Sequence, residues 1–112
     1  MSQYLIRINL YSNIGEDLMD KKRRNKEEIL ADILHASING ATKSRIMYNS
    51  FLNYSQLEKY LNYALDLGLL EHNNSIYKIT DKGREYLNLF DRLKEAEDDI
   101  NSAYTLLAKF LR

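Results

Sequence analysis

A short β-hairpin pattern set between two helical patterns is the feature that most limits the fold of this chain. Residues 69–80 read LLEHNNSIYKIT. Asparagine tolerates positive φ, so Asn73-Asn74 between β-forming flanks predicts a two-residue turn. Alternation along the second strand places Tyr77 and Ile79 on one face. A hairpin of this size occurs in many folds, so the helical patterns before and after it are needed to identify the fold.

Three helical patterns precede the hairpin. The first begins at Asn25, which forms a capping-box pattern with Glu28, and Asn39-Gly40 ends it. A short second helix is predicted over residues 43–49, and a tight turn with the sequence SFLN leads to a third over residues 54–67. The apolar stripe of this third helix comprises Leu57, Leu61, Ala64 and Leu65.

A long helix is predicted after the hairpin, from Asp81 almost to Arg112. Its apolar residues follow the a and d positions of a heptad repeat, and four such repeats span roughly 40 Å. The apolar seam needs a partner, and a second copy of the chain is the simplest one. The pattern leaves parallel and antiparallel pairing open. The predicted dimer contacts are Leu93, Ala96, Ile100, Ala103, Tyr104, Leu107, Phe110 and Leu111.

Helix, short helix, tight turn, helix and hairpin is the order of a winged helix-turn-helix domain, in which the hairpin is the wing. We therefore predict a mainly α fold with a small β-hairpin wing and a long C-terminal coiled-coil helix. The predicted parts are an N-terminal extension over residues 1–20, the winged domain over 21–83 and the dimerisation helix over 84–112. The run YLIRINLY at residues 4–11 favours an extra strand in the extension.

Three segments carry a resemblance to a known family: KKRRNKEEILADIL, ATKSRIMYNSFLNYSQLEKYLNYALDLGLLE and YKITDKGREYL. The chain resembles the small winged-helix DNA-binding proteins of thermophilic archaea that carry a C-terminal dimerising coiled coil. The resemblance covers residues 21–93, and the tail by its pattern alone. It implies a homodimer joined by an antiparallel coiled coil, with two winged domains that bind duplex DNA. Family members are generally basic, whereas this chain is neutral and has an acidic tail. That difference favours a selective regulator over a bulk packaging protein.

The distribution of charge points to one region for contacts with an anionic partner. The net charge of the chain is zero, but residues 21–45 hold seven basic groups against three acidic ones. In winged domains the third helix enters the major groove of DNA, whose width fits one α-helix. The plain alternative is that these polar residues form an ordinary solvated surface. The predicted DNA contacts are Lys21, Lys22, Arg23, Arg24, Lys43, Arg45, Tyr54, Ser55, Gln56, Lys59, Asn62, Tyr63, Asn74 and Lys78.

Composition argues against catalysis, metals and membranes. The chain has no cysteine and two histidines, which nearly excludes a zinc site or a Cys/His nucleophile. It has no phosphate-binding glycine loop and no paired acid and base, so we expect no enzyme activity and no cofactor. No apolar run approaches the roughly 20 residues that cross a bilayer, and no signal peptide is visible. We expect a cytoplasmic, nucleoid-associated protein.

Three single residues have simpler interpretations. Gly83 lies in the first turn of the last helix, where glycine is unfavourable, so we expect close packing there. His35 has apolar neighbours and is expected to be partly buried, and His72 is expected at the surface.

Two other functions stay open from the sequence. A neutral, tyrosine-rich winged helix also suits a protein–protein interaction module. A dimer with two DNA-binding domains also suits an architectural protein that bridges two duplexes.

Overall fold

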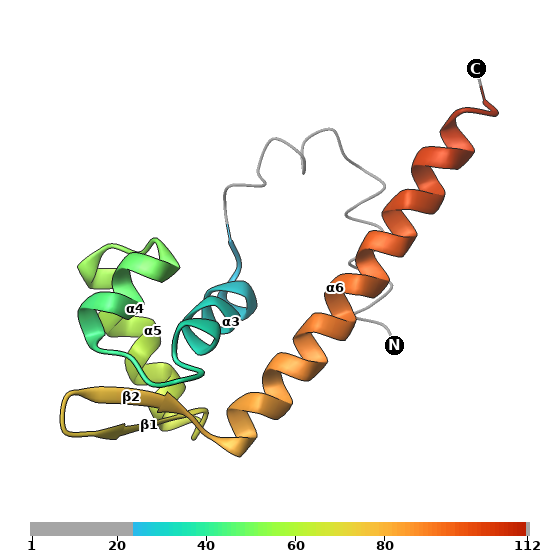
Figure 1. Cartoon of the computed structure of the whole chain (residues 1–112). Coiled ribbons are helices and arrows are strands. Elements are labelled where there is room, and N and C mark those ends of the chain that lie inside the picture. The colour runs from blue at the N-terminus through green and yellow to red at the C-terminus, as the bar shows by residue number, and fades with distance from the viewer. Residues whose placement is uncertain (1–23, 112) are drawn as a thin grey trace. The chain divides into compact units, whose positions relative to one another are not determined.

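The computed structural model describes residues 24–111, and its elements follow the predicted order (Figure 1). Residues Arg24–Phe90 form one compact unit, and the chain from Asp91 onward belongs to a second. The fold is mainly α with one two-stranded antiparallel hairpin, as predicted. The elements are α3 (Lys26–Ala36), α4 (Lys43–Ser50), α5 (Tyr54–Asp66), β1 (Leu70–Asn73), β2 (Ile76–Ile79) and α6 (Asp81–Ala108).

Several sequence predictions concern residues that the structure does not describe. Two of them lie outside the described residues: the predicted strand over residues 4–11, and the predicted DNA contacts Lys21, Lys22 and Arg23. The predicted boundary between the winged domain and the dimerisation helix, at residues 83 and 84, falls inside α6. The helix is continuous at this point, so the boundary stays a prediction.

Local hydrogen bonds determine where the helices begin. Asn25 accepts a 2.8 Å hydrogen bond from the backbone N–H of Glu28, and the Glu28 carboxylate accepts one from the backbone N–H of Asn25. This confirms the predicted capping box of α3. Asn53 and Gln56 form a second capping box at the start of α5. Each box satisfies N–H groups that the first turn of a helix leaves without partners.

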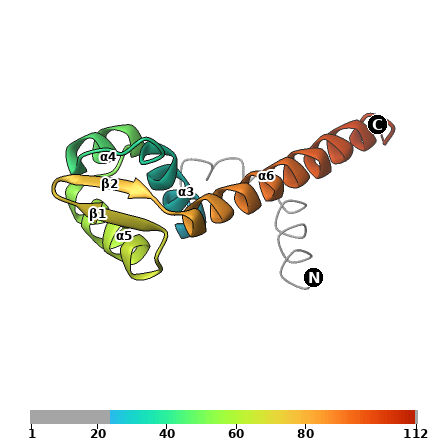
Figure 2. The same ribbon diagram turned by 60° about the horizontal axis from the view of Figure 1, so that its bottom comes forward.

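The core of the compact unit lies where α3 packs against α4 and α5. Figures 1 and 2 show the hairpin beside α5. Tyr77 of β2 also exchanges two backbone hydrogen bonds with Ala41, of 2.8 and 2.9 Å, which join the hairpin to the loop before α4. No strand pattern marks Ala41 in the sequence, so this bridge was not predicted. The buried apolar residues are Ile29, Leu30, Ala31, Ile33, Leu34, Ala41, Ile46, Leu52, Leu57, Leu61, Ala64, Leu69, Leu70, Tyr77, Ile79 and Leu87.

The turn of the hairpin lies one residue later than predicted. Asn73 pairs with Ile76, so the two turn residues are Asn74 and Ser75, and Asn74 has φ 59°. A turn at residues 73–74 would set Ile79 opposite Gly68, which has φ 76° and ends the preceding helix.

The observed register has a clear packing advantage. It pairs Ile79 with Leu70, and both side chains are buried. It also sets His72 opposite Tyr77, with the two rings stacked at 4.0 Å between centroids. The cross-strand pairs Leu70–Ile79 and His72–Tyr77 therefore favour the observed register over the turn propensity of two adjacent asparagines.

The start of α6 is packed tightly against the hairpin. Thr80 caps the helix by accepting a hydrogen bond from the backbone N–H of Gly83. A Cβ atom at Gly83 would lie 2.3 Å from the carbonyl oxygen of Leu69 and 2.6 Å from the Ile79 side chain. This confirms that close packing explains the glycine.

Tyr86 of α6 makes a contact with α3, and His35 of α3 is placed differently from its prediction. The Tyr86 hydroxyl donates to the Glu27 carbonyl, which ties α6 to the start of α3, and burial raises the pKa of Tyr86 to about 12. His35 is exposed, so the prediction of a partly buried histidine is wrong. The buried residues of α3 lie on one side of the helix, and His35 lies on the opposite side.

Candidate nucleic-acid interface

The outward side of α5 is the surface that the sequence predicted for DNA contacts. The apolar stripe of the helix is turned inward, with Leu57, Leu61 and Ala64 at most 2% exposed. Because an α-helix repeats every 3.6 residues, the polar positions fall on the opposite side. All six predicted residues of this helix are exposed, and we call them the α5 face: Tyr54, Ser55, Gln56, Lys59, Asn62 and Tyr63.

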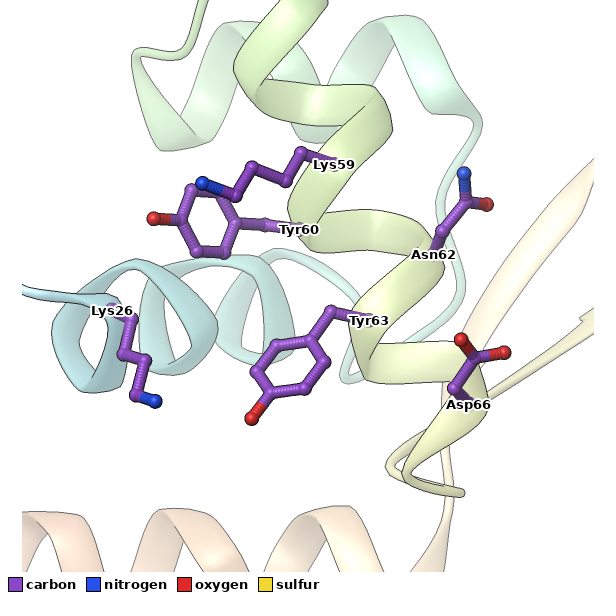
Figure 3. Close-up of a pocket in the computed structure, with 6 residues that line it drawn as sticks. All are labelled: Lys26, Lys59, Tyr60, Asn62, Tyr63 and Asp66. Carbon is purple, nitrogen blue, oxygen red and sulfur yellow. The ribbon is translucent and has the colours of Figure 1, made fainter.

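An open depression of about 480 Å³ lies along the C-terminal half of the α5 face (Figure 3). Lys59 crosses the ring of Tyr60, with its Nζ 5.2 Å from the ring centroid, a cation–π distance. Lys26 reaches the depression from α3 and Asp66 from the last turn of α5. The predicted surface lacked both residues. Lys26 is brought there only by the packing of α3 on α5, so no local pattern could place it.

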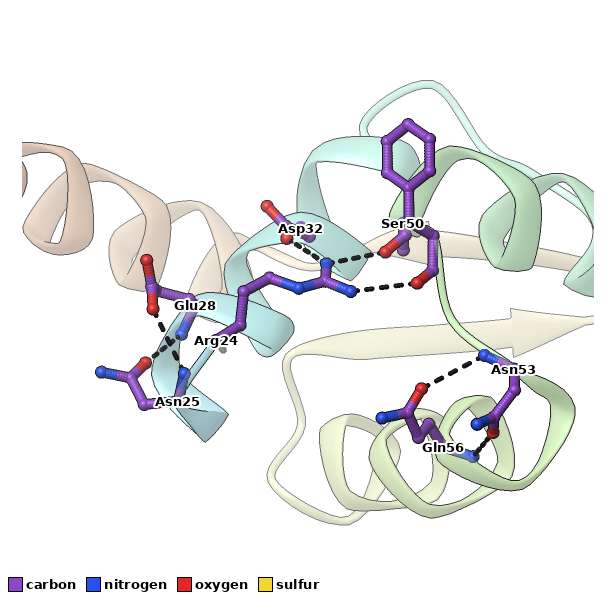
Figure 4. A network of polar contacts seen from close by, with 8 residues as sticks. Arg24, Asn25, Glu28, Asp32, Ser50, Asn53 and Gln56 are labelled. Carbon is purple, nitrogen blue, oxygen red and sulfur yellow. Dashed lines mark hydrogen bonds and ion pairs between the residues drawn. The ribbon is translucent and has the colours of Figure 1, made fainter. Parts of the chain in front are cut away.

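Gln56 is less free than its exposure suggests (Figure 4). Its side-chain oxygen accepts a 3.2 Å hydrogen bond from the backbone N–H of Asn53. This bond uses one of the two lone pairs of the Gln56 oxygen and holds the amide toward the start of α5. A bidentate pair with adenine needs one donor and one acceptor. The capping role of Gln56 therefore competes with the base-reading role predicted for it, and Lys59 and Asn62 become the stronger candidates.

Lys43 is partly neutralised by an acidic neighbour. Its Nζ lies 2.6 Å from Glu58 Oε2, and this hydrogen bond lowers the pKa of the Glu58 carboxyl and raises the pKa of Lys43. A hydrogen bond with Glu58 also raises the pKa of Tyr54. Arg45 and Lys59, by contrast, form no ion pair with any residue in 24–111. These two cations are therefore available for a phosphate.

Arg24 has a structural role that was not predicted. Its guanidinium lies 2.6 Å from Asp32 Oδ2 and donates to the carbonyl oxygens of Ser50 and Phe51 at 2.7 and 3.0 Å (Figure 4). These carbonyls belong to the C-terminal end of α4, where an α-helix lacks internal donors. A cation at this end also complements the helix dipole. Arg24 thus fastens the start of the domain to the α4–α5 turn, and these bonds use three of its five N–H donors.

The wing offers few charges. Asn74 is at its tip and exposed, and Lys78 is exposed on the face opposite Tyr77. In the strand register Lys78 stands directly across from Glu71. The predicted wing contacts are therefore accessible, but an acidic neighbour accompanies the only cation of the wing.

Comparison with known families agrees with this geometry. The family described as winged helix-turn-helix matches residues 23–98, which is more than half of the chain. The chain belongs to the winged helix-turn-helix family. In the terms of this family, α5 is the third helix of the domain and the β1–β2 hairpin is its wing.

Two archaeal proteins are similar to this winged helix-turn-helix chain over most of their length. An uncharacterized protein of Methanocaldococcus jannaschii is 28% identical over 96 residues, which cover 80% of this chain and 96% of the relative. The crystal structure of Sso10a-2, a DNA-binding protein from Sulfolobus solfataricus, matches with a TM-score of 0.71 and 28% identity. That match covers 80% of this chain and 98% of the other. The archaeal family resemblance is confirmed.

Helix α6 carries the predicted dimerisation seam. It has 28 residues, so it is roughly 40 Å long at 1.5 Å per residue. The last turns of α6 and the residues just after it are rich in exposed apolar side chains: Tyr104, Leu106 and Leu107 lie on the helix and Phe110 and Leu111 follow it, and all five are 45–85% exposed. An apolar surface of this kind is typical of a contact site.

The described residues form neither a metal-binding cluster nor a membrane span. Within residues 24–111, no three acidic, histidine or cysteine side chains are grouped so that they could hold a metal ion. None of the described helices has the length and hydropathy to cross a bilayer.

Proposed function

We propose that this protein is a homodimer that binds double-stranded DNA through α5 and acts as a transcriptional regulator. The observation that carries the proposal is the α5 face. It is a row of exposed polar and aromatic side chains on the third helix of a winged domain, backed by a buried apolar stripe. Such a helix fits the major groove, which is about 12 Å wide. The similarity to Sso10a-2, a DNA-binding protein, supports the same reading.

Each side chain of the α5 face has a chemical role in this proposal. Asn62 can pair with an adenine edge through one donor and one acceptor. Lys59 donates to guanine or to a phosphate oxygen, and Ser55 can meet either a base or a phosphate. Arg45 at the start of α4 contacts the backbone, which positions the helix without reading sequence. Lys26 enlarges the cationic part of the surface beside Lys59.

Dimerisation through α6 supplies the second half of the mechanism. Two winged domains joined by their last helices present two α5 faces to DNA. The paired helices then set the distance between two half-sites, as in other dimeric helix-turn-helix proteins. The exposed apolar residues of the last turns of α6 support this arrangement.

A salt titration with duplex DNA tests the proposal. Binding should weaken steeply with salt, because each phosphate contact contributes a slope of about 0.9 in a plot of log affinity against log salt. Lys59→Ala should weaken binding and reduce the slope by about one per protomer. Lys82→Ala is the control, because Lys82 is an exposed lysine at the start of α6 and outside the α5 face. Its Nζ donates to the carbonyl of Leu67 at the end of α5, so urea denaturation must show that this variant folds as the parent does.

The outcomes separate the competing functions. If the parent protein binds no duplex at low salt, the DNA-binding proposal fails and an interaction module becomes the better account. If Lys59→Ala and Lys82→Ala have equal effects, α5 is not the contacting helix. A regulator should protect two short half-sites from nuclease, whereas an architectural protein should protect long tracts or hold two duplexes together.

A further inference from the structure

The corner between α4 and α5 exposes three aromatic side chains within seven residues of chain. Tyr48 is 78% exposed, Phe51 83% and Tyr54 62%. Tyr48 lies in the last turn of α4, Phe51 is its C-terminal cap and Tyr54 is the first residue of α5. We call these three residues the aromatic corner. Rings with this much exposure add little to the core of the domain.

Phe51 is held in a conformation that is unusual for a large side chain. Its φ of 54° and ψ of 47° lie in the left-handed region, where glycine or asparagine normally ends a helix. The backbone is fixed on both sides, because the N–H of Phe51 donates to Tyr48 and its carbonyl accepts from Arg24. A strained backbone that holds an exposed apolar ring in place is a feature of contact sites.

The charge around the aromatic corner favours an anionic partner. Residues 42–57 contain no aspartate or glutamate and two cations, Lys43 and Arg45. The acids that reach this segment are paired, Glu58 with Lys43 and Asp32 with Arg24, and Arg45 is the cation of the segment that forms no ion pair with a described residue. Lys43 Nζ lies 6.0 Å from the centroid of the Tyr54 ring. Exposed rings beside cations match the surface of single-stranded nucleic acid, which offers flat bases and phosphates together.

We propose that the aromatic corner stacks on unpaired bases. This inference rests on the proposed function and deepens it: the protein would prefer duplex DNA that contains a short single-stranded gap. In an intact duplex each base is covered by its neighbours, and Phe51 has no base face to contact. A gap exposes such a face while the flanking duplex remains available to α5.

The test compares three DNAs of equal length: an intact duplex, a duplex with a short thymine gap, and the same gap built from abasic nucleotides. The abasic gap keeps the flexibility and the phosphates but removes the bases. The parent protein should bind the thymine gap about 5- to 150-fold more tightly than the other two, the range for one stacked base. Phe51→Asn should abolish this preference and leave binding to the intact duplex unchanged.

The choice of variants keeps the test independent of folding. Asparagine accepts the left-handed backbone, so Phe51→Asn should fold as the parent does. Phe51→Tyr keeps an aromatic ring and should keep the preference, whereas Phe51→Leu keeps apolar bulk and should lose most of it. Ile38→Asn, at an exposed apolar residue in the α3–α4 turn, is the control for a simple loss of hydrophobicity.

Each result has one meaning. Equal binding to all three DNAs by the parent overturns this inference, while the proposed function stands on intact-duplex binding. Binding to none of them overturns the proposed function itself. If Phe51→Asn keeps the thymine preference, the stacking site lies elsewhere. If Phe51→Asn instead changes the sedimentation of the free protein, the aromatic corner is a contact between copies and the inference is wrong.

Discussion

Ser37 and Ser50 are both fully buried at the C-terminal ends of helices, yet their hydroxyl groups differ. Ser37 Oγ donates a 2.8 Å hydrogen bond to the carbonyl of Ile33. Ser50 Oγ has no hydrogen-bond partner in the described part of the chain. A buried polar group without a partner keeps its full desolvation cost, whereas a satisfied one contributes a modest net stabilisation.

This difference predicts opposite effects for the same substitution. Ser37→Ala should lower the free energy of unfolding by about 1 kcal/mol, because a buried carbonyl loses its donor. Ser50→Ala should leave it unchanged or raise it by a few tenths of a kcal/mol. Urea denaturation of the two variants and the parent measures both values. Equal losses in the two variants would contradict the assignment of Ser50 as unsatisfied.

At the scale of elements, the junction between the hairpin and α6 leaves no room for a Cβ atom at Gly83. Glycine in a helix is less favourable than alanine by about 1 kcal/mol, so propensity alone recommends Gly83→Ala. The added Cβ would lie 2.3 Å from the carbonyl oxygen of Leu69, which is far too close. This oxygen belongs to the backbone, so it cannot move aside as the end of a flexible side chain can. Packing here outweighs propensity.

Gly83→Ala should therefore destabilise the domain by about 1–3 kcal/mol, the usual cost of overpacking. Gly68→Ala is the control, since Gly68 has φ 76° and open space around its added Cβ, with Lys82 at 3.8 Å. It should cost only the backbone strain of about 1 kcal/mol. Thermal unfolding of both variants provides the comparison. A Gly83→Ala variant more stable than the parent would show that the junction can open without cost.

At the scale of the whole molecule, the proposed dimer depends on which residues of α6 form the seam. Leu106 and Leu107 are adjacent and almost equally exposed, at 57% and 56%. Leu107 occupies the predicted a position of the heptad, and Leu106 lies beside the seam at g. The two leucines thus differ in heptad position and in little else.

Leu107→Asp should dissociate the dimer, because a carboxylate in an apolar seam loses its hydration without gaining a partner. Leu106→Asp should leave the dimer intact, since g positions commonly carry charge. Sedimentation of the two variants at several concentrations distinguishes these results. If the parent is a monomer, or if both variants remain dimers, the proposed dimerisation through the apolar seam of α6 is wrong.

The sequence by itself determined the features that depend on neighbours within a few residues. The capping box of α3, the buried stripe of α5 and the order of elements all follow from helix periodicity and from side chains three or four positions apart. These interactions form wherever the backbone is helical. Their partners are therefore visible in the sequence.

Only the tertiary structure decided the contacts between residues that are distant in the chain. Arg24 bonds to Ser50 and Phe51, 26 and 27 residues away, and so occupies donors that the sequence assigned to DNA. The pairing of Leu70 with Ile79 shifted the hairpin turn by one residue. The carboxylate of Glu58, bonded to Lys43, offsets the positive charge of this lysine. Each of these contacts joins residues that are distant in the sequence. Its contribution to stability outweighs the local propensities on which the sequence prediction relied.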